Sequence, residues 1–191
     1  MLQTIISRVR RNHGLEHATI HVLSENHTGF SAQGNSDHRG FSLNVYGDLS
    51  EEQVEAAVYE AQRRLRAGQH GLALHPNCGT VLVTTATMAT LAGQTVFGMG
   101  DRRRAVTEDK WSVLLNTGPL AVLMVVLAII VSRPVGMFLQ ERFTTEGDIG
   151  SLEVVDVRAV TPSIVTRIFQ LLLVAGRSDL RPQAYRITTR N

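Results

Sequence analysis

The sequence predicts an α+β membrane protein with a small N-terminal α/β domain, a two-helix transmembrane hairpin, and C-terminal strands accompanied by an amphipathic helix. Three observations predict this class. Two long apolar runs follow one another in the middle of the chain, helical and alternating patterns precede them, and strand-like segments follow them. We expect the three parts to comprise residues 1–78, 79–132 and 133–191.

The composition excludes several classes of protein. Of the 191 residues, 43% are hydrophobic and 19% are charged, which is too few charges for a disordered chain. Nineteen Lys and Arg against 17 Asp and Glu give a net charge of +2, too balanced for a nucleic-acid-binding protein, so we expect no nucleic acid partner. The single cysteine, Cys78, excludes an intramolecular disulfide and a four-cysteine zinc ribbon.

The first part of the chain contains one helix and one clear strand. A helix is predicted over residues 5–23, because apolar residues recur there with the helical period. Its C-terminal half has a second apolar face, so we expect that half to be buried on two sides. Residues 25–40 are rich in Asn, Ser, Gly and His and are typical of a loop or a loose hairpin. Alternating apolar and polar residues at 41–46 predict a half-buried strand.

The clearest helix covers residues 50–68. Ser50 and Gln53 have the spacing of a capping box, and Gly68 suits the position after the last turn. Acidic residues in the first turn and basic residues in the last turn complement the helix dipole. A single apolar stripe indicates ordinary core packing by Val54, Ala57, Val58, Ala61 and Leu65.

Two apolar runs predict membrane spans. Residues 112–131 contain no charged residue, and Trp111 stands at their start, where interfacial aromatic residues often lie. Arg133 and Pro134 interrupt this apolar run at its other end. Residues 80–99 form a weaker run rich in threonine and small residues, which let helices approach closely in a membrane. We expect the two spans to pack as a hairpin, with the lipid bilayer and other membrane-protein subunits as partners.

Two observations favour opposite orientations of the protein in the membrane. Arginines at 102–104 favour a cytoplasmic connection between the spans, whereas the absence of a signal peptide favours a cytoplasmic N-terminal domain. Arginines at 63, 64 and 66 partly offset the triplet. We therefore expect a multi-pass protein of the cell inner (plasma) membrane with its N-terminal domain in the cytoplasm.

After the hairpin, residues 152–160 and 184–190 have the composition of strands. The apolar run between them, at 162–175, is short and is interrupted by Arg167. This pattern predicts an amphipathic helix that lies at the membrane surface.

A group of three residues on the first helix could carry chemistry. On a helix, His13, Glu16 and His17 fall within an arc of about 100°. Two imidazoles four residues apart can bind one zinc ion, and a carboxylate beside them can activate a zinc-bound water. The structural alternative is a buried hydrogen-bond cluster that holds this helix in place. Both interpretations remain open at the level of sequence.

Further zinc ligands are expected in the turn 75–80. Its Pro76 and Gly79 favour a turn that aims His75 and Cys78 in one direction. The alternative is a turn that starts the membrane helix, with Asn77 or Thr80 as the cap and Cys78 as a small buried filler. Other candidates for the third ligand are His21, Glu51, Glu52 and Glu55.

Several segments together resemble an uncharacterised family of two-helix membrane proteins of cyanobacteria and Chloroflexota, known as a domain of unknown function. The resemblance rests on Arg10–Leu23, on Gly40–Gly47, on the helix end at Gly68, and on His75–Thr80. It covers residues 8 to 160 and the last strand. It implies a small domain followed by two membrane helices and implies no activity.

The string from His13 to His17 also resembles the zinc helix of pitrilysin-type peptidases. That resemblance implies His13 and His17 as zinc ligands and Glu16 as general base. It covers five residues. The family's further ligand glutamate would fall in the predicted first span, which contains no acidic residue.

Three hypotheses about function follow. The first is a membrane-anchored, zinc-dependent hydrolase, peptidase-like, with Glu16 as the base. The second is a non-catalytic membrane accessory or assembly subunit in which His13, Glu16 and His17 form a structural cluster. The third is a metal-binding sensor or carrier without hydrolysis.

Overall fold

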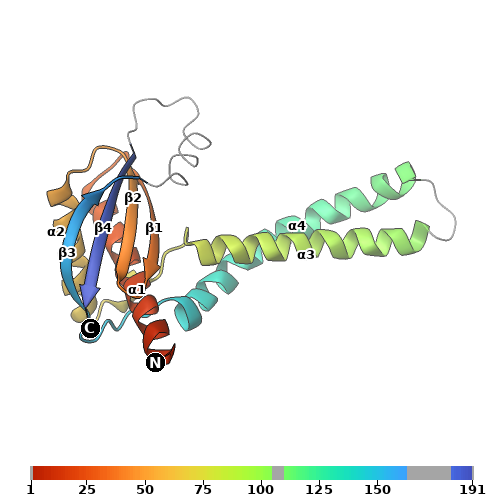
Figure 1. Cartoon of the computed structure of the whole chain (residues 1–191). Helices are drawn as coiled ribbons and strands as arrows, with labels where there is room; N and C mark the ends of the chain where they lie inside the picture. Colours follow the sequence, from red (N-terminus) through yellow and green to blue (C-terminus); the bar gives the residue numbers. More distant parts are fainter. Residues whose placement is uncertain (1, 105–109, 163–181, 191) are drawn as a thin grey trace. The chain divides into compact units, whose positions relative to one another are not determined.

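The computed structural model describes residues 2–104, 110–162 and 182–190. The chain divides into two compact units, one made of Met1–Leu74 with Glu141–Asn191 and the other of His75–Gln140 (Figure 1). The amphipathic helix expected at 162–175 falls on residues outside the described ones, so it stays a prediction.

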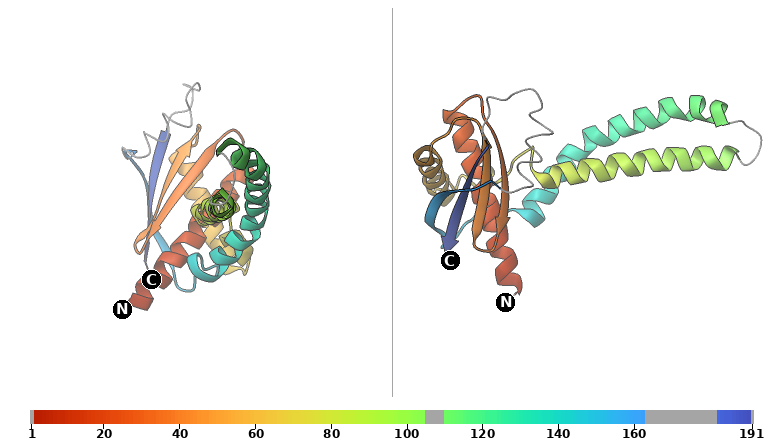
Figure 2. Two further views of the ribbon diagram at one scale, coloured as in Figure 1. Left: turned by 90° about the vertical axis from the view of Figure 1, so that its right-hand side faces the viewer. Right: turned by 45° about the horizontal axis from the view of Figure 1, so that its top comes forward.

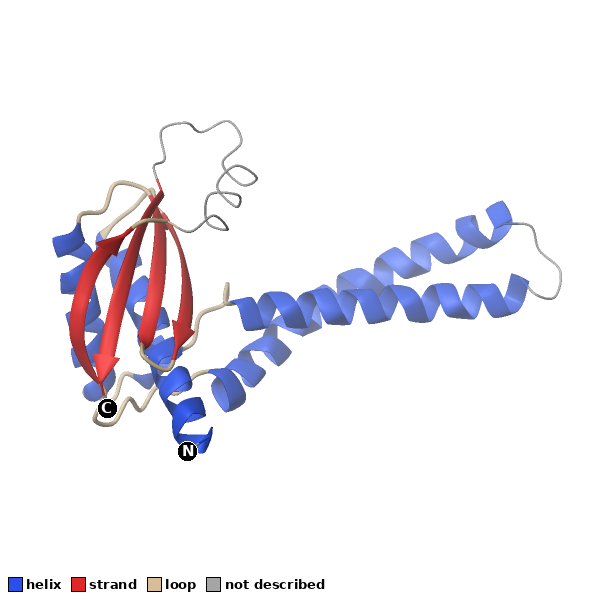
Figure 3. Cartoon of the chain, viewed as in Figure 1, coloured by secondary structure: helices blue, strands red, loops and turns tan. Residues whose placement is uncertain are grey.

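The first unit contains a four-stranded antiparallel sheet in the order β1-β2-β4-β3. Strands β1 (Ser31–Asp37) and β2 (Gly40–Tyr46) precede the second unit in the chain, whereas β3 (Glu153–Val160) and β4 (Pro182–Arg190) follow it. Figure 3 shows the four strands as one sheet. The sheet is therefore completed only when the chain returns from the second unit.

The predicted strands at 41–46, 152–160 and 184–190 are confirmed as β2, β3 and β4. The stretch 25–40, expected to be a loop or a loose hairpin, instead contains the regular strand β1, which pairs with β2. Most residues of β1 are exposed. It carries no apolar alternation, so the sequence had no strong signal for a strand there.

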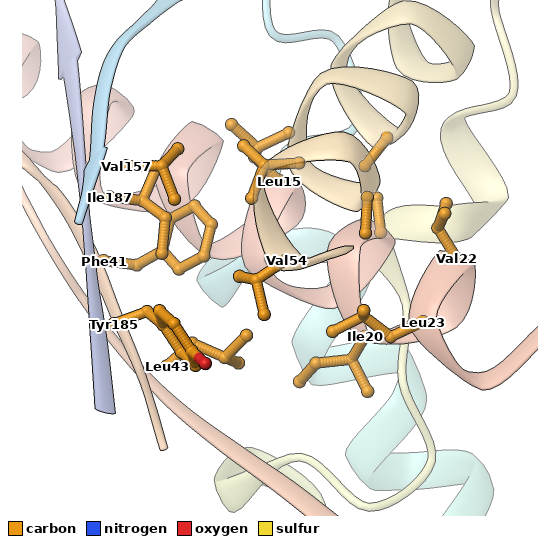
Figure 4. Close-up of a cluster of buried hydrophobic side chains, with 14 of the residues drawn as sticks. Leu15, Ile20, Val22, Leu23, Phe41, Leu43, Val54, Val157, Tyr185 and Ile187 are labelled. Carbon is orange, nitrogen blue, oxygen red and sulfur yellow. The ribbon is translucent and has the colours of Figure 1, made fainter. Parts of the chain in front are cut away.

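Two helices, α1 (Leu2–Asn26) and α2 (Glu51–Arg66), cover one face of the sheet and lie behind it in Figure 3. The α+β class is thereby confirmed. The core lies between helices and sheet, and Figure 4 shows how the two layers meet. Its fully buried members include Leu15, Leu23, Phe41, Leu43, Val54, Val58 and Ile187.

Helix α1 extends beyond both ends of its predicted range. Its C-terminal half is buried on two sides, as predicted, because Leu15, Ala18 and Val22 are buried together with Leu23. The first turns are less buried than the C-terminal half. Ile5 is 41% exposed and Ile6 is 49% exposed, because the helix there extends past the layer of core residues. Only the second half of α1 is thus held by the core.

The prediction for α2 is confirmed in detail. The Ser50 side chain accepts a hydrogen bond from the Gln53 backbone N–H, and the Gln53 side chain accepts one from the Ser50 N–H, so the capping box is complete. Gly68 follows the helix with a φ of +88°, a left-handed conformation that favours glycine. The whole predicted apolar stripe is buried.

The second unit consists of α3 (Gly79–Arg104) and α4 (Lys110–Leu139), which lie side by side (Figure 2). Two helical segments, Gly79–Met99 and Leu115–Thr144, are long and apolar enough to cross a membrane. Only 11% of each is buried. These helices are therefore not the buried core helices of a soluble unit within the described structure.

The helix that contains the second predicted span, 112–131, is longer than that span. Helix α4 continues through Arg133 and Pro134 to Leu139, and a short π-helical segment, η2 (Gln140–Thr144), follows. A proline forfeits one backbone hydrogen bond, but its fixed φ is compatible with a helix. The apolar residues on both sides of Pro134 keep favouring helix, so one lost bond does not end it.

Candidate functional site

His13 and His17 lie one turn apart on α1, and the structure brings their rings together. The ring centroids are 4.4 Å apart and the ring planes meet at 61°, an edge-to-face arrangement. His17 is buried and His13 is half-buried. The spacing of four residues thus places two imidazoles on the same side of the helix.

Each of these rings is oriented by a backbone carbonyl. Nδ1 of His13 is 2.9 Å from the carbonyl oxygen of Thr144, and Nδ1 of His17 is 2.8 Å from that of Ala73. A carbonyl oxygen only accepts hydrogen bonds, so Nδ1 is the protonated donor in both rings. In a neutral ring the lone pair then lies on Nε2. Metal-binding histidines show the same arrangement, with a second-layer acceptor that fixes the tautomer.

His21 lies one turn further along α1 but uses its other nitrogen. Its Nε2 is 2.8 Å from the carbonyl oxygen of Leu74 and donates the hydrogen bond. The three histidines together tie α1 to two neighbouring segments, the short η1 helix (His70–Ala73) with Leu74, and the end of η2. Of these three histidines, only His13 and His17 donate this hydrogen bond through the same nitrogen, Nδ1.

Glu16 lies between the two histidines in sequence, and its carboxylate is directed at β1. The Ser36 hydroxyl donates a hydrogen bond of 2.6 Å to Glu16 Oε2. A Cβ at Gly34 would overlap the Glu16 carboxylate, so the backbone of β1 lies directly against this side chain. Burial raises the pKa of Glu16, while the Ser36 hydrogen bond and the nearby His13 act in the opposite direction.

The other expected ligands belong to the second unit. His75 and Cys78 share a turn, with the Cys78 N–H donating to the His75 carbonyl at 3.2 Å. The Cys78 carbonyl accepts bonds from the Val81 and Leu82 N–H groups, so Cys78 takes the capping position of α3 that was expected for Asn77 or Thr80. Cys78 is a buried thiol.

His75 is held differently from the histidines of α1. Its Nδ1 accepts a hydrogen bond from the Asn77 N–H at 3.3 Å. The Gln140 amide binds the His75 backbone twice, accepting from its N–H at 2.6 Å and donating to its carbonyl at 3.0 Å. The remaining candidates, Glu51, Glu52 and Glu55, are exposed on α2.

Sequence analysis missed the residues that hold the site. Gly34 and Ser36 accommodate the Glu16 carboxylate, and the carbonyls of Ala73 and Thr144 orient the rings. A buried acid on a predicted core helix does require a polar partner. No residue pattern, however, indicates which strand supplies that partner.

The comparisons with known proteins show to which family the chain belongs. The family described as Domain of unknown function (DUF6391) matches residues 8–157. An uncharacterized protein of Picosynechococcus sp. is 31% identical over an alignment of 154 residues, and the match covers 70% of this chain and 70% of that protein. No solved structure matches the chain. The family match includes His13, Glu16 and His17 of α1, the turn with Cys78 and the helical hairpin.

Proposed function

Since the chain belongs to the family of the domain of unknown function DUF6391, its function has to be inferred from its own residues, and we propose that it is a membrane-anchored zinc-binding protein. His13 and His17 hold the ion in this proposal, and Cys78 is the third ligand. The α3–α4 hairpin anchors the protein in the bilayer, where its exposed apolar side chains contact lipid.

One observation carries the zinc proposal. Both adjacent rings donate Nδ1–H to a backbone carbonyl, so both carry the Nε2 lone pair that a metal ion requires. If the two rings served only to tie loops to α1, either nitrogen would do, as it does in His21. The identical tautomer of the two touching rings favours a shared ligand.

Cys78 is the donor that best completes the set. Two histidine nitrogens and one cysteine sulfur form the kind of ligand set that zinc prefers, and Cys78 is the cysteine of this sequence. His75 fits less well, because its Nδ1 accepts a hydrogen bond and its Nε2 then carries the proton in the neutral ring.

Hydrolysis is the activity we propose for such a site. A zinc ion held by three protein ligands would keep one position open and would supply the Lewis-acid chemistry of hydrolysis there. Glu16 is the residue proposed to accept a proton in that reaction. Its burial, its raised pKa and its place between the two ligand positions support this role.

One observation favours a second candidate function. The hydrogen bonds of His13, His17 and Glu16 connect α1 to three different segments of the first unit. Such a cluster would equally serve a non-catalytic accessory or assembly subunit, in which these residues stabilise the fold. The two functions differ in whether the protein binds zinc.

Metal content per chain tests the proposal. The full-length protein is purified in detergent as wild type and as His13→Ala, His17→Ala, Cys78→Ser and His21→Ala. We expect about one zinc per chain in the wild type, consistent with a single three-ligand site. We expect that zinc to be lost in the first three variants and retained in His21→Ala, which loses a comparable loop contact.

The same preparations separate the two candidate functions. A well-folded wild type that takes up no zinc, even after zinc is added, would establish the structural cluster instead. If zinc is bound, Glu16→Gln should keep the zinc and lose hydrolysis of a peptide library. Zinc binding with no turnover in either protein would leave a metal-binding protein and remove Glu16 as the base.

A further inference from the structure

Three polar side chains form a stripe along the exposed side of α3. Thr87, Thr90 and Gln94 follow one another at the spacing i, i+3, i+7 and are all exposed. At 100° per residue they fall within an arc of about 60°. Val81 and Thr85, which meet Gly136 and Ser132 of α4, lie on roughly the opposite side of the helix. The stripe therefore faces away from α4.

These three side chains differ from the other polar groups of the same helix. The hydroxyls of Thr84, Thr85 and Thr95 donate to the carbonyls four residues earlier, at 2.8–2.9 Å. Thr85 also pairs with Ser132 of α4 at 2.7 Å. Within the part of the chain that the structure describes, the side chains of Thr87, Thr90 and Gln94 make no hydrogen bond.

The position of Gln94 along α3 determines whether its amide can be hydrogen-bonded by water. Ala89 is the midpoint of the 21-residue segment Gly79–Met99, and Gln94 lies about 7.5 Å along the helix axis from it. The hydrocarbon core extends roughly 15 Å on either side of its centre. If α3 spans the bilayer, as the proposed function holds, a primary amide is exposed to a region without water. Such a group needs a polar partner.

We propose that the stripe of Thr87, Thr90 and Gln94 is a dimer interface, and that its partner is the same stripe of a second copy of this chain. An amide carries both a donor and an acceptor, so two Gln94 side chains can satisfy each other across a two-fold axis. Copies inserted in the same orientation place Gln94 at the same depth. The threonines beside it are small enough for the two helices to approach closely.

Self-association in lipid bilayers tests the proposal on the full-length protein. Energy transfer between labelled copies, measured at increasing dilution in lipid, gives the association constant. We expect Gln94→Leu to weaken association about tenfold, which corresponds to roughly 1.4 kcal/mol. Thr95→Val is the matched control: it is exposed on the same helix, but its hydroxyl already bonds to Leu91, and association should be unchanged. Gln94→Asn should retain most of the association.

Two results would overturn the dimer: a wild type that stays monomeric in bilayers, or a Gln94→Leu variant that associates as tightly as the wild type. Alkaline extraction of membranes distinguishes this failure from that of the proposed function. A protein that resists extraction yet does not associate refutes only the dimer. A protein that is released into the soluble fraction refutes the membrane span and the dimer with it.

Discussion

The Glu16 carboxylate lies where a side chain at position 34 would otherwise be. Glycine at position 34 has no side chain and so leaves space for this carboxylate. The Ser36 hydroxyl donates a hydrogen bond to it, and Glu16 lies buried between α1 and β1. A buried acid without such partners would destabilise the fold. Strand β1, at the edge of the sheet, is therefore polar and poor in side-chain volume where it faces the Glu16 carboxylate.

Replacing Gly34 with alanine should destabilise the first unit by about 1–3 kcal/mol, because the added methyl group overlaps the Glu16 carboxylate. Denaturant unfolding in detergent measures the change. Gly71→Ala is the control, since nothing lies within 4 Å of a Cβ there. In the Glu16→Ala background the cost of Gly34→Ala should largely disappear. Equal stability of the Gly34→Ala and Gly71→Ala variants would contradict this packing.

The tertiary structure also sets which nitrogen of His13 and of His17 carries the proton. Their spacing alone predicts that His13 and His17 face the same side of a helix. Which nitrogen of each ring carries the proton depends on the carbonyls of Thr144 and Ala73, residues far away in sequence. The chemical character of the pair is thus set by tertiary contacts.

Helices α3 and α4 approach each other closely where Gly136 meets Val81. A Cβ at Gly136 would lie 2.9 Å from the Val81 Cα atom, so the glycine permits the two backbones to come together. The nearby hydrogen bond of 2.7 Å between Thr85 and Ser132 joins the same two helices. Small residues and hydroxyls at a helix interface are typical of packing in membranes.

Gly136→Ala should therefore loosen the hairpin, with a loss of about 1–3 kcal/mol, because the added methyl group meets backbone rather than a flexible side-chain end. Thermal unfolding of the detergent-solubilised protein, followed by circular dichroism, measures this. Gly118→Ala is matched to it in the same helix, and nothing lies within 4 Å of the Cβ. We expect no loss at Gly118. A Gly136→Ala variant that melts with the wild type would show that the helices do not depend on this contact.

The order of the strands in the sheet constrains how the α3–α4 hairpin can cross a membrane. Strands β1 and β2 come before the hairpin and β4 and β3 come after it, yet β2 pairs with β4 in one sheet. Both ends of the hairpin must therefore lie on the same side of any membrane. An even number of crossings satisfies this condition, and two spanning helices provide it.

Reporter fusions test this topology. With α3 and α4 both spanning, a reporter at the C-terminus should be active in the cytoplasm, and one inserted between residues 105 and 109 should be active outside. A phosphatase that works only outside and a fluorescent protein that works only in the cytoplasm give complementary signals. Cytoplasmic signals from both positions would mean that the hairpin does not cross the membrane. A phosphatase active at the C-terminus would reverse the orientation we expect.

The sequence by itself determined the helices and motifs that depend only on residues close together in the chain. The period of α1, the capping box and apolar stripe of α2, and the apolar runs of α3 and α4 are all properties of neighbouring residues. The same holds for the pairing of His13 with His17. The extension of α4 past Pro134 was not predicted, because proline is a strong local signal against helix that a long apolar helix overrides.

Only the tertiary structure decided what depends on residues distant in the chain. Strands separated by the hairpin form one sheet, polar β1 is held by its pairing with β2, and Gly34 with Ser36 receives the Glu16 carboxylate. Two carbonyls from different segments orient the rings of His13 and His17. Burial and hydrogen bonding are satisfied in three dimensions, so a one-dimensional pattern shows which residues need partners and not which partners they find.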